Sequence, residues 1–157
     1  MSKLEIALFF HLLGAFLFVA GIVVAGVVFE SARRRSEPGE IALLLSLARW
    51  GVLIVLLGAT LVLAFGLWLV HIEGLSYGTG WVSAAIALYV FALLLGGLGG
   101  RRPKQARRLA QSLRDEGSPA TPQLRALLDD RIADAANYLS ALAVLAILVL
   151  MVFKPGA

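Results

Sequence analysis

The sequence predicts an all-α membrane protein, built as a four-transmembrane-helix bundle with both termini on the outer (periplasmic or extracellular) side. Three observations predict this: a strongly apolar composition, four long apolar blocks, and an uneven distribution of lysine and arginine. Of the 157 residues, 60% are hydrophobic and 15% are charged, and the mean hydropathy is +0.88. Soluble domains carry about 25% charged residues, so this composition excludes a soluble enzyme, a DNA-binding domain and a disordered tail.

Each of the four apolar blocks is long enough to cross a bilayer, which takes about 20 residues. The predicted spans are residues 4–29, 48–72, 81–99 and 132–153 of a single membrane domain that covers residues 1–157. The first block is too long for the apolar region of a signal peptide, and arginines follow it instead of preceding it, so we expect an uncleaved span. Aromatic residues lie near the predicted span ends, as interfacial belts require: Trp50, Trp68, Tyr77 and Trp81.

The distribution of cations predicts the orientation of the chain. Four lysine and arginine residues separate the first two spans and eight separate the last two, whereas the opposite side carries Lys3 and Lys154. Positive charge favours the cytoplasmic side, so loops 30–47 and 100–131 are predicted to be cytoplasmic. We therefore expect a multi-pass protein of a bacterial cytoplasmic (inner) membrane. The sequence pI of about 10.0 comes from these loop charges and does not indicate nucleic-acid binding.

The longer cytoplasmic loop is predicted to contain a short amphipathic helix at residues 103–116. Its basic face beside the membrane is expected to hold anionic lipids, and a protein-docking surface is the alternative. Thr121 followed by Pro122 is typical of a helix N-cap with proline at the first helical position. From there the helical pattern continues to Phe153, so the fourth helix is expected to project a few turns into the cytoplasm.

Two histidines in or beside the spans, His11 and His71, are the candidate cofactor-binding residues, because an ionisable group at membrane depth is costly. His11 shares a helical face with small residues, including Gly14, Ala15 and Gly21, which predicts that this face meets another helix. Bulky substitution at Gly21 should therefore disrupt packing. His71 shares a face with Thr60, Ala64, Leu67 and Trp68 in the second span.

The predicted topology brings the start of the first span and the end of the second to the same surface. His11 and His71 together would suit a b-type haem, or copper with Met151 as an additional soft ligand. The two imidazoles must lie at similar depth to share a cofactor, and His11 is about 10 Å along the helix from Leu4. Separate roles, His11 in packing and His71 in the interface, are the alternative.

The fourth span contains further polar residues in its cytoplasmic half, among them Asp134, Asn137, Tyr138 and Ser140. We expect Asp134 to lie at the interface beside Arg131 and Asn137 to hydrogen-bond a neighbouring helix. The functional alternative is a small transporter or channel with Asp134 and Asn137 at its cytoplasmic mouth. Gly96 and Gly100 form a small-residue motif that either packs closely or ends the third helix.

The first span, with the pattern Phe10-His11-Leu12-Leu13-Gly14 and a second glycine at Gly21, carries a family resemblance. The chain resembles an uncharacterised bacterial family of predicted four-span integral membrane proteins. It is more distantly similar to the copper-resistance D-like and oxygen-independent protoporphyrinogen-oxidase-like membrane proteins. The resemblance implies a four-helix bundle and His11 as a haem or metal ligand. The chain departs from these more distant groups, because its spans contain no lysine or arginine away from their ends, and few methionines and histidines are present.

No catalytic motif is evident, and without cysteine the chain has no thiol nucleophile and no cysteine-based metal site. The sequence favours an accessory or partner-binding membrane protein, either alone or as a subunit of a larger membrane complex. A haem- or copper-binding redox protein that uses His11 and His71 is the first alternative. A small transporter or channel is the second alternative.

Overall fold

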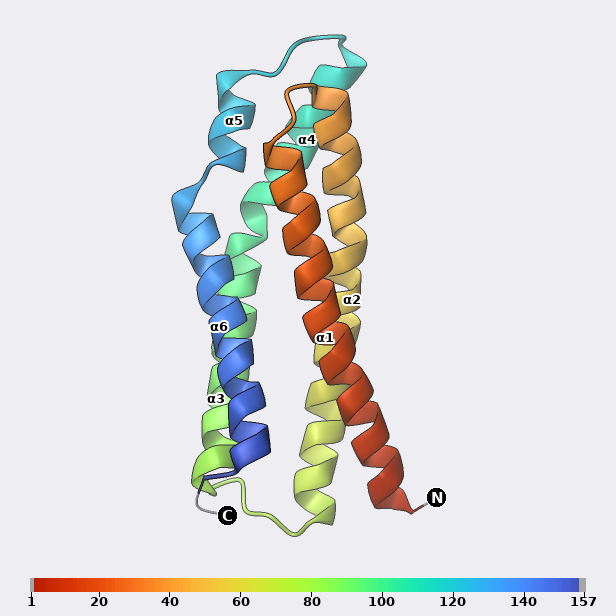
Figure 1. The fold of residues 1–157 in the computed structure, drawn as a ribbon, viewed down its shortest axis with the longest axis vertical. Coiled ribbons are helices and arrows are strands. Elements are labelled where there is room, and N and C mark those ends of the chain that lie inside the picture. The colour runs from red at the N-terminus through yellow and green to blue at the C-terminus, as the bar shows by residue number, and fades with distance from the viewer. Residues whose placement is uncertain (1, 156–157) are drawn as a thin grey trace.

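The computed structural model describes residues 2–155, and these residues form a bundle of six helices (Figure 1). The helices are α1 (Lys3–Arg33), α2 (Pro38–Ile72), α3 (Gly80–Gly99), α4 (Arg101–Asp115), α5 (Pro122–Leu128) and α6 (Arg131–Phe153). Four long helical segments are apolar enough to cross a membrane, namely α1, α2, α3 extended by α4, and α5 extended by α6.

The long helices form two antiparallel pairs, α1 with α2 and α3 with α6 (Figure 1). Both described chain ends and the α2–α3 connection lie at one end of the bundle. At the other end, α4 and α5 join the last turns of α1 and the first turns of α2 in a helical head. The two described chain ends therefore lie at the same end of the bundle, and the basic segments gather at the opposite end.

Local capping explains where the helices begin. The Ser2 hydroxyl accepts from the amide of Glu5, whose carboxylate accepts from the amide of Ser2, which forms a capping box at the start of α1. The predicted N-cap at Thr121 is confirmed, since its hydroxyl accepts from the amide of Leu124.

The prediction that the helix continues without a break to Phe153 is wrong, because α5 ends at Leu128 and α6 begins at Arg131. Asp130 starts the new helix, because its carboxylate accepts from the amides of Ile132 and Ala133, each at 3.0 Å. Asp130 thereby replaces the backbone hydrogen bonds that a continuous helix would make.

The α1–α2 pair packs backbone against backbone at glycines. A Cβ atom added at Gly14 would lie 2.7 Å from the Cβ of Leu61 and 3.0 Å from the carbonyl oxygen of Gly58. One added at Gly21 would lie 2.7 Å from the amide nitrogen of Val55 and 2.8 Å from the carbonyl oxygen of Gly51. The glycines are seven residues apart on each helix, so the predicted small face of α1 meets a matching small face of α2.

In the α3–α6 pair, polar side chains of α6 pack against small residues of α3. Ser140 donates to the carbonyl oxygen of Ala92 at 2.8 Å, and it lies beside Gly96. The amide of Asn137 occupies the space over Gly99 that a side chain would need. The glycines at the end of α3 therefore have a packing role, because they admit these two α6 side chains at the level where α3 leaves its apolar stretch.

The two pairs meet in the middle of the bundle through Tyr89, which donates to the carbonyl oxygen of Ala59 at 2.9 Å. Ten residues further toward the head, at about 1.5 Å per residue, lie Gly99 on α3 and Arg49 on α2. These two residues are therefore at about the same height. The α2 residues that precede Arg49 lie beside α4, beyond the apolar stretch of α3.

The helical head contains the most completely buried large side chains among the described residues, namely Ile41, Leu124 and Leu128. The apolar face of α4, formed by Ala106, Ala110 and Leu113, packs in the same cluster. The amphipathic helix expected near residues 103–116 thus buries its apolar side inside the chain and not in lipid. Its basic side faces outward.

Gly21→Leu should destabilise the protein, whereas Gly26→Leu on the same helix should not. A side chain at Gly26 meets nothing within 4 Å, whereas one at Gly21 collides with the α2 backbone. Overpacking of this kind costs about 1–3 kcal/mol. Thermal unfolding in detergent should show a lowered midpoint for Gly21→Leu alone. Equal midpoints for the two variants would show that this face of α1 is not packed.

Candidate functional site

His11 of α1 is held in a defined position against α2. Its Nδ1 atom lies 3.1 Å from the carbonyl oxygen of Val62. Because a carbonyl oxygen can only accept, Nδ1 donates, and Nε2 of the neutral ring keeps its lone pair. The ring lies over Gly66, where an added Cβ would be 3.0 Å from Cε1. A histidine oriented through a backbone carbonyl in this way resembles the supporting contact of many metal ligands.

His11 lines a small cavity of about 40 Å³ between the two helix pairs. Four other residues on its wall bring both pairs to this point, namely Phe18, Tyr89, Ile147 and Met151. Met151, the soft ligand considered from the sequence, therefore shares a cavity with His11. The volume suits a single ion or a few water molecules. It is far below the roughly 300–1,000 Å³ of cavities that enclose organic ligands.

His71 lies elsewhere, exposed at the penultimate position of α2. It is five residues past Gly66, which is about 7.5 Å along the helix. His71 is not among the described residues that line the His11 cavity. The structure thus places His11 in one cavity with Met151 and Tyr89, and it places His71 at the exposed end of α2. Shared ligation by the two histidines remains a prediction from the sequence.

Asp134 forms an ion pair with Arg33, a contact that no pattern in the sequence indicates. Arg33 Nη1 donates to Asp134 at 2.9 Å, and Nη2 donates to Asp129 at 3.2 Å. The Arg33 and Asp134 side chains are 25% and 21% exposed, so the pair is partly shielded from water. The contact joins the end of α1 to the start of α6 across about a hundred residues of sequence, a separation at which local patterns carry no signal.

Arg125 reinforces the same junction. From α5 it donates to the carbonyl oxygens of Arg33, at 2.9 Å, and of Arg35. These carbonyls belong to the C-terminal end of α1, where helix carbonyls lack partners within the helix. Arg33 and Arg125 therefore act together to fasten the α1–α2 pair to the segment that leads into α6.

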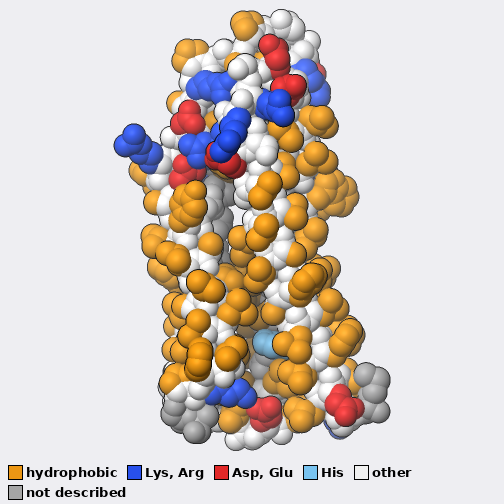
Figure 2. All heavy atoms as spheres, in the orientation of Figure 1, with side chains coloured by type: hydrophobic (Ala, Val, Ile, Leu, Met, Phe, Trp, Pro, Cys, Tyr) orange, Lys and Arg blue, Asp and Glu red, His pale blue; other side chains and the backbone are white. Residues whose placement is uncertain are grey.

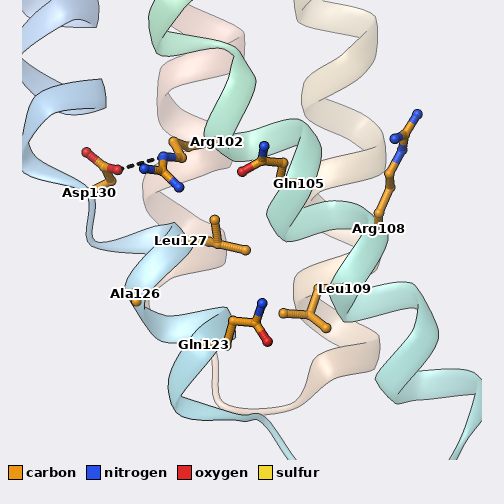
Figure 3. Close-up of a pocket in the computed structure, with 8 residues that line it drawn as sticks. All are labelled: Arg102, Gln105, Arg108, Leu109, Gln123, Ala126, Leu127 and Asp130. Atoms are coloured by element: carbon orange, nitrogen blue, oxygen red, sulfur yellow. Dashed lines mark ion pairs between the residues drawn. The ribbon is translucent and has the colours of Figure 1, made fainter.

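A larger groove of about 580 Å³ lies between α4 and α5 in the head (Figure 3). Its wall includes Arg102, Gln105 and Leu109 from α4, and Gln123, Leu127 and Asp130 from α5 and the residues that follow it. In Figure 3, Gln105, Leu109, Gln123 and Leu127 face the space between the helices, and the Arg108 guanidinium points away from it. No pattern in the sequence indicates this groove, because it depends on how α5 folds back on α4.

An ion pair closes one end of this groove, where Arg102 Nε lies 2.8 Å from a carboxylate oxygen of Asp130. The hydrogen bond from the amide of Ala133, together with that from Ile132 and the nearby Arg102 charge, lowers the pKa of Asp130. The carboxylate is thus held in its charged form. Figure 2 shows that charged side chains of both signs gather over the head, whereas the long middle of the molecule is covered by hydrophobic side chains.

A family model described as "Predicted integral membrane protein (DUF2269)" matches residues 5–155. The chain belongs to this family. No curated protein and no solved structure matches the chain. The match covers all four apolar helical segments, so the chain is an integral membrane protein that contacts the lipid bilayer. It supports the resemblance to a family of integral membrane proteins, and it does not support the more distant similarity to the copper-resistance D-like proteins.

Arg33→Met should destabilise the head, whereas Arg34→Met should leave stability nearly unchanged. Arg33 bonds two carboxylates of distant segments, and Arg34, 77% exposed, pairs with Glu30 of its own helix. Loss of the partly shielded contacts should cost about 1–2 kcal/mol. The free energy of unfolding in mixed micelles measures this difference. Equal values for the two variants would contradict the role given to Arg33.

Proposed function

We propose that the chain is an accessory protein of a bacterial inner membrane that binds a partner membrane subunit along α2, with its head in the cytoplasm and its termini outside. The observation that carries this proposal is an exposed apolar stripe that continues past the height of Arg49 into the head. Leu43, Leu47 and Trp50 occupy positions i, i+4 and i+7 of one helical face, with exposed fractions of 62%, 48% and 60%. We call these three residues the α2 stripe.

The α2 stripe supports a protein partner because of where it stands. At about the height of Leu43 and Leu47, the neighbouring α4 presents charged residues such as Lys104. Leucines exposed beside such a charged surface are not covered by lipid chains. Large exposed apolar patches of this kind mark interaction sites. An apolar helix that follows α2 from the bilayer into the head would cover the stripe along its length.

The distribution of charge supports the orientation. The twelve cations of the two basic segments lie at the head end, and two lie at the end that holds the termini. By the positive-inside rule the head faces the cytoplasm. The exposed cations of α4 also make anionic lipids natural contacts of the head, since each cation near such a surface contributes about 1 kcal/mol.

A photo-crosslinking amino acid at Leu43 tests the partner. In cells that express the full chain, we expect one discrete protein adduct from position 43, and none from the same amino acid at Ser112, an exposed position on α4. Adducts at neither position, or at both in equal amount, would contradict a partner on the α2 stripe.

The absence of cysteine makes the orientation testable with single substitutions. Ser36→Cys, in the α1–α2 connection, should be protected from a membrane-impermeant maleimide added to intact spheroplasts. Ser76→Cys, in the α2–α3 connection, should be labelled. The reverse pattern would invert the proposed topology.

A second candidate function is copper binding by His11 and Met151, which the cavity they share favours. Nε2 of His11 is free to coordinate, and imidazole with thioether suits Cu(I). A haem ligated at His11 would require the helix pairs to separate, because a porphyrin exceeds the present volume. Copper therefore fits the cavity better than haem b does.

Competition between the purified protein and a Cu(I) chelator tests this candidate. We expect one equivalent of Cu(I) per chain, loss of binding in His11→Ala, weakening in Met151→Leu, and no change in His71→Ala. An absorption spectrum of the same samples, taken before and after reduction, reports bound haem. Equal binding in the wild-type protein and in His11→Ala would contradict the assignment.

A further inference from the structure

We propose that the groove between α4 and α5 binds the phosphodiester headgroup of an anionic phospholipid. This inference rests on the proposed placement of the head at the bilayer surface, and it names a ligand and a site for that surface. The groove volume of about 580 Å³ lies within the range of small-molecule sites. Its walls combine a charged end, two amides and an apolar floor, and the charged end and the amides match a phosphodiester headgroup with hydroxyl groups.

The position of the groove favours a lipid. Arg102 is three residues past Gly99, where the apolar stretch of α3 ends, and thus about 4.5 Å further along the helix axis. The headgroup region adds about 5–7 Å to each side of the hydrocarbon core. The charged end of the groove therefore lies within the headgroup layer, and the remainder of the groove extends away from the membrane.

Arg102 provides the phosphate-binding group. Its side chain is 50% exposed, and a guanidinium bonds phosphate oxygens in a bidentate manner. Its present partner, Asp130, retains two backbone hydrogen bonds from α6 when Arg102 turns to a ligand. Arg102 can thus exchange Asp130 for a phosphate without leaving the carboxylate unpartnered.

The remaining walls suit the rest of the headgroup. Gln105 and Gln123 face the groove from opposite helices, and their amides can both donate to and accept from glycerol hydroxyls (Figure 3). Leu109 and Leu127 form an apolar floor beneath these amides. The exposed Arg101 and Lys104 on α4 attract negative charge toward this end of the head.

Native mass spectrometry of the full chain in detergent, with added phosphatidylglycerol, tests the proposal. We expect one lipid retained per wild-type chain and about fivefold weaker retention in Arg102→Gln, as the loss of one cation predicts. The double variant Gln105→Ala/Gln123→Ala keeps the ion pair and changes two exposed side chains, so it tests the groove if Arg102→Gln fails to fold. It should also lose retention.

Arg114→Gln is the matched control, because Arg114 is an exposed head cation outside the groove that pairs with Asp115. It should retain lipid as the wild type does. Equal loss in Arg114→Gln and Arg102→Gln would overturn the proposal, since it would indicate general attraction to positive charge. Retention of phosphatidylcholine equal to that of phosphatidylglycerol would exclude selection for anionic lipid.

Soluble glycerophosphoglycerol, which has the same headgroup without acyl chains, separates a lipid from a free phosphate ester. Displacement of phosphatidylglycerol by equimolar soluble headgroup would overturn the lipid assignment, and failure to displace it would support that assignment. These measurements in detergent do not depend on the orientation of the chain or on the α2 stripe. Failure of the groove is therefore distinguishable from failure of the proposed function.

Discussion

The close approach of α1 and α2 at their glycines is the constraint on which the rest of the molecule depends. Lipid chains are as apolar as leucine side chains, so no hydrophobic force draws two helices together inside a bilayer. The pair is held instead by packing between backbones, which Gly14 and Gly21 make possible against Gly58 and Gly51. Any side chain at these positions would clash with backbone atoms of the other helix, and a backbone atom cannot move away by a change of rotamer as a side chain can.

The proposed sites follow from this contact in different ways. His11 reaches the carbonyl of Val62 because the helices are already close, and Gly66 leaves room for its ring. At the other end, the same pair extends past the apolar stretch of α3 and provides the wall against which α4 packs. Arg33 then fastens the end of α1 to the start of α6.

The sequence predicted what depends on local pattern. Four apolar segments, the small-residue face of α1 and the N-cap at Thr121 all agree with the structure, since span length, helical spacing and capping are short-range properties. The seven-residue spacing of Gly51 and Gly58 repeats that of Gly14 and Gly21. This repetition in the sequence would have identified the matching face of α2.

The remainder depends on contacts between distant segments. The ion pair between Asp134 and Arg33 was not predicted, because the two residues are far apart in the sequence and close only in the fold. The break at Asp130 has a local capping signal, but an apolar pattern runs through it. The groove requires α5 to fold back beside α4, and the residue pattern of either helix alone does not indicate that arrangement.

A double-mutant cycle at Gly21 and Gly51 tests the account most directly, with the free energy of unfolding in mixed micelles as the measured quantity. Each single substitution to alanine places a Cβ within 3 Å of the opposite backbone, so each should separate the helices. Once they are separated, the second substitution should cost little. The two single losses of unfolding free energy should therefore sum to at least about 0.5 kcal/mol more than the loss in the double variant. Additive losses, or no loss, would contradict a backbone-to-backbone contact between α1 and α2.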